Sequence, residues 1–169
     1  MKLSHGLLIA GVIVGLGALL FWGYRAASAP LPEGFPLPTA KDDIEIKQYP
    51  AYRAATVKVR GDLTKAPSRG FSPLFRHISE NNISMTAPVE TRYPTATLRA
   101  GTMSEGDATV LFLYRSLDVM PQEVAQNVQV EDMPPMVVVS VGMRGGYGYG
   151  VYERGDAAAP ELASRASGV

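Results

Sequence analysis

Residues 71–89 read FSPLFRHISENNISMTAPV, an amphipathic helical pattern followed at once by a short β-like segment. The apolar residues recur at i, i+3, i+4 and i+7, the spacing of one face of a helix: Phe71, Leu74, Phe75 and Ile78. Ser72 and Pro73 suit an N-cap and a first helical position, although a start at Ser68 keeps the same apolar face. We expect the helix to end near Asn81 and a short strand to follow over 83–89, with Pro88 favouring an edge.

Strand-like segments surround this helix and predict an α+β domain. Residues 109–114 read TVLFLY, a continuous apolar run that is typical of a strand buried on both faces. Shorter β-rich stretches occur on either side, over 44–47, 52–59, 128–130 and 136–141. With a weak helix expected over 157–167, this order of elements hints at a βαββ unit used twice.

Composition sets limits on the function of the 169-residue chain. Hydrophobic residues make up 46% and charged residues 19%, which excludes a disordered chain and permits a packed core. Lys+Arg and Asp+Glu are both 16, so the net charge is zero and we expect no nucleic-acid partner. The chain has no cysteine, which excludes disulfides and thiolate metal ligands, and its two histidines are His5 and His77.

The N-terminal region predicts a membrane segment over residues 6–24, after a short flank of residues 1–5. Residues 6–23 carry no charge and would form a helix about 27 Å long, close to the thickness of a bilayer core. An uncleaved anchor competes with a signal peptide cleaved after Ala29, but Pro30 is a poor residue to follow a cleavage site. Lys2 precedes the span, so the positive-inside rule predicts an extracytoplasmic domain; cleavage would make it secreted or periplasmic.

A proline-rich linker is expected between this segment and the folded domain. Residues 30–40 hold four prolines, which cannot build a helix or an interior strand. We therefore assign residues 25–40 to the linker and 41–169 to the domain.

The sequence motifs of common enzymes are missing from this chain. It has no GxxxxGK[ST] phosphate loop, no GxSxG elbow and no HExxH zinc motif. The nearest acid–base candidate is Glu90, for which the sequence offers no evident partner. We therefore expect a binding protein with no catalytic residues.

One family signature is present. The segment ISMTAPV at 83–89 resembles the (I)xMTxPV signature of the SOUL haem-binding protein family. The preceding helix matches the family's run LF-x-x-I-x-x-x-N at Leu74, Phe75, Ile78 and Asn82. YPAYR at 49–53 resembles its opening strand, and the resemblance extends over about residues 44–150.

The resemblance implies a fold and a ligand. The fold is a distorted β-barrel of two pseudo-symmetric βαββ halves with flanking helices, and the ligand is non-covalent haem or another tetrapyrrole. In the family the apolar face of the first helix lies in the binding cleft, which carries over to Phe71 and Phe75, with Leu74 and Ile78 nearby. Arg76 could then pair with a propionate. The alternative is that this stripe is core and Arg76 is solvated.

His77 is the metal-ligand candidate, as the only histidine in the expected domain. It lies roughly 100° from the centre of the apolar stripe, so it could reach iron at the cleft edge. The alternative is a solvated or capping side chain, because some family members bind haem without a histidine ligand.

The C-terminal region departs from the family pattern, because no YxxPxxP…RNEV run precedes Val169. We therefore expect the second βαββ half to be incomplete. The sequence as a whole predicts a membrane-tethered binder of haem or another tetrapyrrole, for buffering, storage or handover. The alternatives are an effector-binding module for another flat apolar ligand and, less favoured, a hydrolase or a tetrapyrrole-modifying enzyme.

Overall fold

A computed structural model of the protein describes residues 29–94 and 105–143. The chain divides into two compact units, Met1–Pro30 and Leu31–Val169, and every described helix and strand belongs to the second. In chain order these elements are β1 (Ile44–Tyr49), β2 (Tyr52–Gly61), the 3₁₀ turn η1 (Leu63–Lys65), α2 (Ala66–Glu80), β3 (Val89–Arg92), β4 (Gly106–Leu113), β5 (Gln129–Met133) and β6 (Met136–Val141).

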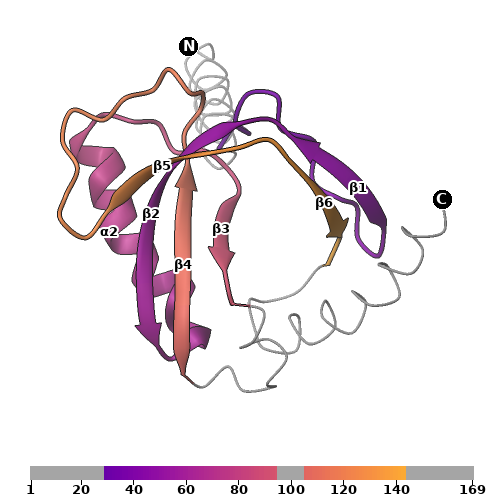
Figure 1. Ribbon diagram of the computed structural model, residues 1–169, viewed down its shortest axis with the longest axis horizontal. Helices are drawn as coiled ribbons and strands as arrows, with labels where there is room; N and C mark the ends of the chain where they lie inside the picture. The colour runs from indigo at the N-terminus through magenta and orange to yellow at the C-terminus, as the bar shows by residue number, and fades with distance from the viewer. Residues whose placement is uncertain (1–28, 95–104, 144–169) are drawn as a thin grey trace, which may run out of the picture. The chain divides into compact units, whose positions relative to one another are not determined.

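A four-stranded antiparallel sheet with the order β3-β4-β2-β5 is the centre of the fold (Figure 1). Strand β4 lies inside the sheet, and its residues from Val110 to Leu113 are buried on both faces. The apolar run TVLFLY therefore forms the doubly buried strand that its composition predicts.

The strands β1 and β6 extend this sheet as a bent two-stranded ribbon. Tyr49 pairs with Met136 and Tyr52 pairs with Met133, so the register continues unbroken from β1/β6 into β2/β5. This continuity places the step Pro50-Ala51 opposite the step Pro134-Pro135. Proline has no backbone N–H to donate, so the ladder is interrupted where both strands turn away from the main sheet (Figure 1).

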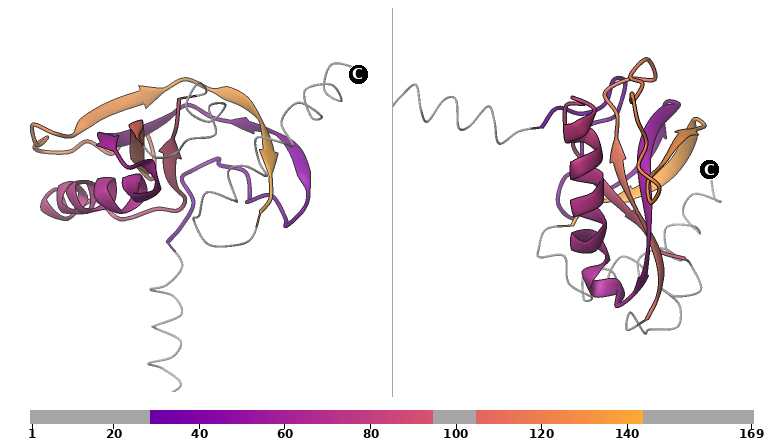
Figure 2. Two further views of the ribbon diagram at one scale, coloured as in Figure 1. Left: turned by 90° about the horizontal axis from the view of Figure 1, so that it is seen from below. Right: turned by 90° about the vertical axis from the view of Figure 1, so that its left-hand side faces the viewer.

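Helix α2 packs against β2 and β4 on one face of the four-stranded sheet (Figure 2). Its buried side chains join Val57, Val59 and Val110 in the larger of two hydrophobic cores. At Gly70 the helix lies very close to β4, because a Cβ at this position would lie 2.5 Å from the Val110 Cβ. The glycine is what allows the helix to sit this close to β4.

The helix starts earlier than its sequence pattern predicts, at Ala66 instead of Ser68 or Ser72. The preceding turn η1 supplies the reason, because the Asp62 carboxylate accepts a hydrogen bond from the Thr64 N–H at 3.0 Å and so caps the turn. Pro67 then occupies the first turn of α2, where its missing N–H costs nothing.

The prediction of a strand over 83–89 is wrong, because β3 begins only at Val89. The preceding residues of the MTAPV segment connect the helix to the sheet by side-chain contacts. The buried Thr86 hydroxyl donates to the Leu113 carbonyl oxygen at 2.5 Å, and Met85 packs against the core beneath α2. This part of the motif therefore fastens a loop to the end of β4.

The proline-rich segment before β1 packs against the sheet. Phe35 makes edge contacts with Tyr49 and Tyr52, with ring centroids 5.1 Å apart in each case. The Lys47 ammonium donates to the Leu37 carbonyl oxygen. Contacts of the folded unit therefore begin before Lys41, within the stretch assigned to the linker.

The α+β class is confirmed, with two sheets and one α-helix among the described residues. The expected closed barrel is not formed by residues 29–94 and 105–143, because β1 and β6 pair only with each other. The expected second helix and the segment 6–24 lie outside these residues. Within them, no helix is long and apolar enough to span a membrane.

Candidate functional site

The exposed side of α2 carries two stacked phenylalanines. Phe71 and Phe75 lie one helical turn apart, with ring centroids at 5.8 Å and ring planes inclined by 11°. Their exposed fractions are 37% and 48%. Single exposed apolar residues are common on proteins, but adjacent large ones often mark a binding surface.

The Phe71 ring packs against the strand beside the helix. Phe71 makes an edge contact with the buried Phe112 of β4, with ring centroids 5.1 Å apart. Val89 of β3 pairs with Phe112 in register, shares its face of the sheet, and is 36% exposed. We call Phe71, Phe75 and Val89 the aromatic patch. Phe112 supports this patch from below and holds the Phe71 ring in place.

The residues of the predicted apolar stripe are partly buried in the core and partly exposed on the surface of α2. Leu74 and Ile78 are buried in the core between α2 and the sheet, so they hold the helix and are shielded from a surface ligand. Arg76 is exposed next to Phe75, and within the described residues it has no hydrogen bond or ion pair. The stripe therefore supplies both the core contacts of α2 and the exposed patch.

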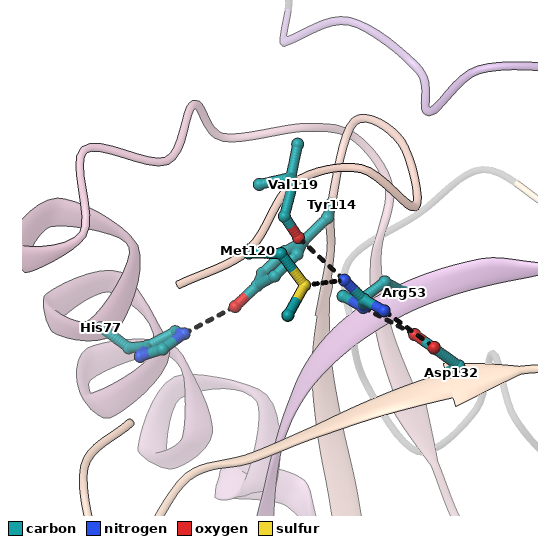
Figure 3. Close-up of polar contacts among 6 residues, drawn as sticks. All are labelled: Arg53, His77, Tyr114, Val119, Met120 and Asp132. Carbon is teal, nitrogen blue, oxygen red and sulfur yellow. Dashed lines mark hydrogen bonds and ion pairs between the residues drawn. The ribbon is translucent and has the colours of Figure 1, made fainter. Parts of the chain in front are cut away.

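His77 lies inside the protein. Its side chain is 2% exposed, and a hydrogen bond of 2.7 Å joins its Nε2 to the Tyr114 hydroxyl (Figure 3). Burial lowers the pKa of His77 below 6.5 and raises the pKa of Tyr114 to about 12. Both side chains are therefore neutral at pH 7, and iron would have to displace the tyrosine to reach Nε2.

Asn81, at the end of α2, lies one helical turn after His77 and contacts a loop that is distant in the sequence. Its amide group donates to the carbonyl oxygens of His77 and Glu123, at 2.9 Å each, and its Oδ1 accepts from the N–H groups of Gln122 and Glu123. The loop after β4 is thereby tied to the helix end, beside His77. The solvated His77 considered from the sequence is wrong, because a helical wheel does not include a loop from forty residues further along the chain.

Arg53 holds the other side of this loop (Figure 3). Its guanidinium makes a bidentate ion pair with Asp132 of β5, at 2.6 and 2.8 Å, and donates to the Val119 carbonyl oxygen at 3.3 Å. It also contacts the Met120 sulfur. The hydrogen bond from Arg53 is the main cause that lowers the pKa of Asp132. The loop after β4 is thus fixed between α2 and β5.

The described residues fit a non-covalently bound tetrapyrrole better than a metal ion alone. Within 29–94 and 105–143, no three side chains of His, Asp or Glu gather as metal ligands would. The aromatic patch offers a flat apolar surface of the kind that covers a porphyrin face, and Arg76 offers a cation beside it. Sequence patterns pointed to Phe71, Phe75 and Arg76, whereas Val89 and Phe112 join the site only through strand pairing.

Comparison with known proteins identifies the family of the chain. A family model described as SOUL heme-binding protein matches residues 35–156. The match begins at Phe35, the residue that packs against Tyr49 and Tyr52. No curated protein matches the sequence. The family match covers more than two thirds of the 169 residues, and the chain belongs to the SOUL heme-binding protein family.

Proposed function

We propose that this protein binds haem or another tetrapyrrole non-covalently on the aromatic patch of α2. Family membership supports a tetrapyrrole ligand. The observation that carries the choice of site is the parallel, half-exposed pair of rings at Phe71 and Phe75. A porphyrin is a broad apolar disc, and offset contacts between aromatic rings contribute about 0.5–1.5 kcal/mol beyond the area that they bury.

Arg76 gives the proposal a polar anchor. Its guanidinium is free of protein partners among the described residues and follows Phe75 directly in the helix. A guanidinium can donate two parallel hydrogen bonds to one carboxylate, which is the geometry that a porphyrin propionate offers. We therefore assign the ring face to Phe71 and Phe75 and a propionate to Arg76.

The sequence also predicts His77 as a candidate axial ligand of the haem iron. It requires Nε2 to exchange the Tyr114 hydroxyl for iron, at a position that is 2% exposed. The ring contacts proposed for the patch need no iron ligand. Binding should therefore depend on the porphyrin disc more than on the metal.

Titration of the full chain with haemin, followed by absorbance, tests the function. We expect a saturable Soret shift at one haemin per chain, and similar affinity for metal-free protoporphyrin because the ring supplies the contacts. A shift that rises without saturation would contradict a defined site. A screen with flat aromatic ligands of other classes tests the effector-binding alternative, which predicts one of them to bind more tightly than porphyrins.

We also propose that residues 6–24 tether the domain to a membrane, on its extracytoplasmic side, where it buffers, stores or hands over its ligand. The uncharged run over 6–23 and the lysine that precedes it support this proposal. The tethered protein should stay with membranes after washing at alkaline pH, and added protease should reach the domain from outside. An N-terminus found at Pro30 would instead indicate a cleaved signal.

A further inference from the structure

A second candidate site lies on the face of the four-stranded sheet that points away from α2. It is a hollow of about 660 Å³, a volume typical of small-molecule sites, near the ends of β2, β3 and β4. Lys58 and Arg60 line it and alternate along β2 with Val57 and Val59, which belong to the core beneath the helix. The two cations therefore point to the opposite face of the sheet from the aromatic patch.

Strand pairing lines up three polar side chains across this hollow. Lys58 pairs with Thr109, and Thr109 pairs with Arg92, so one row crosses β2, β4 and β3. Residues that pair in this way share a face, and neighbouring strands are about 4.8 Å apart. A hydroxyl thus lies between two cations whose backbones are about 10 Å apart, which leaves room for an anionic group between them.

The charges of this hollow are unbalanced. Three cations line it, against one lining carboxylate at Asp107 and the Glu90 carboxylate that pairs with Arg92 beside it. Arg60 donates to Asp107 at 2.8 Å and, ahead of Lys58, is the main cause that lowers the pKa of this carboxyl. Lys58 itself has no hydrogen bond or ion pair within the described residues. Its ammonium is therefore available to an incoming anion.

The Arg92 side chain is held in position by hydrogen bonds to two neighbouring residues. Its Nη2 donates to the Tyr52 hydroxyl at 2.6 Å and to the Glu90 carboxylate at 3.1 Å, and the tyrosine is buried. A guanidinium has five N–H donors, so further donors stay available to a ligand after these contacts. Such orientation by the protein lowers the entropy lost when a ligand binds.

We propose that this hollow binds a small organic anion. Its carboxylate or phosphate group lies between Lys58 and Arg92 and accepts a hydrogen bond from Thr109, and its apolar body lies against Pro94, which also lines the hollow. The site is separate from the tetrapyrrole surface, because the sheet lies between them. Both ligands can therefore be bound at the same time.

Calorimetric titration of the full chain in a nonionic detergent tests this site, with phenyl phosphate, benzoate and benzyl alcohol as probes. We expect at least one of the two anions to bind at one per chain, and the neutral alcohol not to bind measurably. In Lys58→Gln the affinity for that anion should fall about tenfold, the effect of losing one charged hydrogen bond. The relative strength of the two anions distinguishes a phosphate site from a carboxylate site.

Lys41→Gln is the matched control, because it removes an exposed lysine that pairs with Asp42 outside the hollow. It should leave the affinity unchanged, as should Phe75→Glu on the opposite face. Equal losses in Lys58→Gln and Lys41→Gln would overturn the proposal, as would the absence of any anion binding. The affinity of Lys58→Gln for haemin should equal that of wild type. A failure of the anion-site proposal can therefore be distinguished from a failure of the tetrapyrrole proposal.

Discussion

His77 of α2 and Tyr114, which follows β4, form a hydrogen bond of 2.7 Å between two side chains that are almost completely buried. Their rings also lie nearly parallel, with centroids 6.3 Å apart. The bond joins the last turn of the helix to the end of the central strand, across 37 residues of sequence. This helix carries the aromatic patch, so the bond helps to fix the position of the proposed binding surface.

Tyr114→Phe removes the hydroxyl and leaves a buried imidazole nitrogen without its partner. We expect the free energy of unfolding to fall by about 1–3 kcal/mol, the usual cost of an unsatisfied buried polar group. Urea denaturation measures this change. Tyr49→Phe is the matched control, since its hydroxyl makes no hydrogen bond within the described residues, and equal stability losses would contradict a special role for Tyr114.

Stability should depend on pH through His77. Burial lowers its pKa in the folded state below the value of about 6.5 in the unfolded chain, so the unfolded state takes up the proton first as the pH falls. The contribution is complete above about pH 6.5 and is lost as the pH falls toward the folded pKa, by at most about 1.4 kcal/mol per pH unit. Denaturation at pH 7.5 and 5.5 checks this, and His77→Gln should show a smaller difference between the two.

Gly70→Ala should destabilise the protein although alanine favours helices. A Cβ at this position would lie 2.5 Å from the Val110 Cβ, so the helix must move away from β4. We expect a loss of about 1–3 kcal/mol in the free energy of unfolding, larger than the gain of about 1 kcal/mol in helix propensity. Ser72→Ala on the exposed side of α2 is the control. A Gly70→Ala variant as stable as wild type would show that this contact is loose.

The iron environment tests the role of His77 directly. In the structure its Nε2 is engaged by Tyr114, so we expect haemin bound to His77→Gln to have the same Soret maximum as haemin bound to wild type. Glutamine keeps a hydrogen-bonding group at this position, which limits disturbance of the core. A shifted maximum in a variant of unchanged circular dichroism would establish His77 as an axial ligand.

Periodicity in the sequence predicted the elements whose signals are local. The i, i+3, i+4, i+7 stripe identified α2, and the run TVLFLY identified β4. The stripe could not show that Leu74 belongs to the core and Phe75 to the surface, because that depends on how the helix is rotated against the sheet. The burial of His77 was missed for a similar reason, since it depends on a distant loop.

The pairing of the strands also could not be predicted from sequence patterns. The sequence showed prolines at 50, 134 and 135, but only the register places Pro50-Ala51 opposite Pro134-Pro135. In the same way, Lys58 and Arg92 are 34 positions apart along the chain and meet in one row only through Thr109. Long-range contacts of this kind leave no periodic signal in a single sequence.

The central claim is that the stacked pair on α2 is the tetrapyrrole surface, and haemin titration of Phe75→Glu tests it most directly. Phe75 is 48% exposed, so the fold should tolerate a carboxylate that removes the stacking and repels propionates. Ile46→Glu on β1 is the control, an exposed apolar residue outside the aromatic patch. We predict at least about tenfold weaker haemin binding in Phe75→Glu alone, from the loss of about 1.4 kcal/mol or more. Equal affinity in Phe75→Glu and wild type would contradict the account.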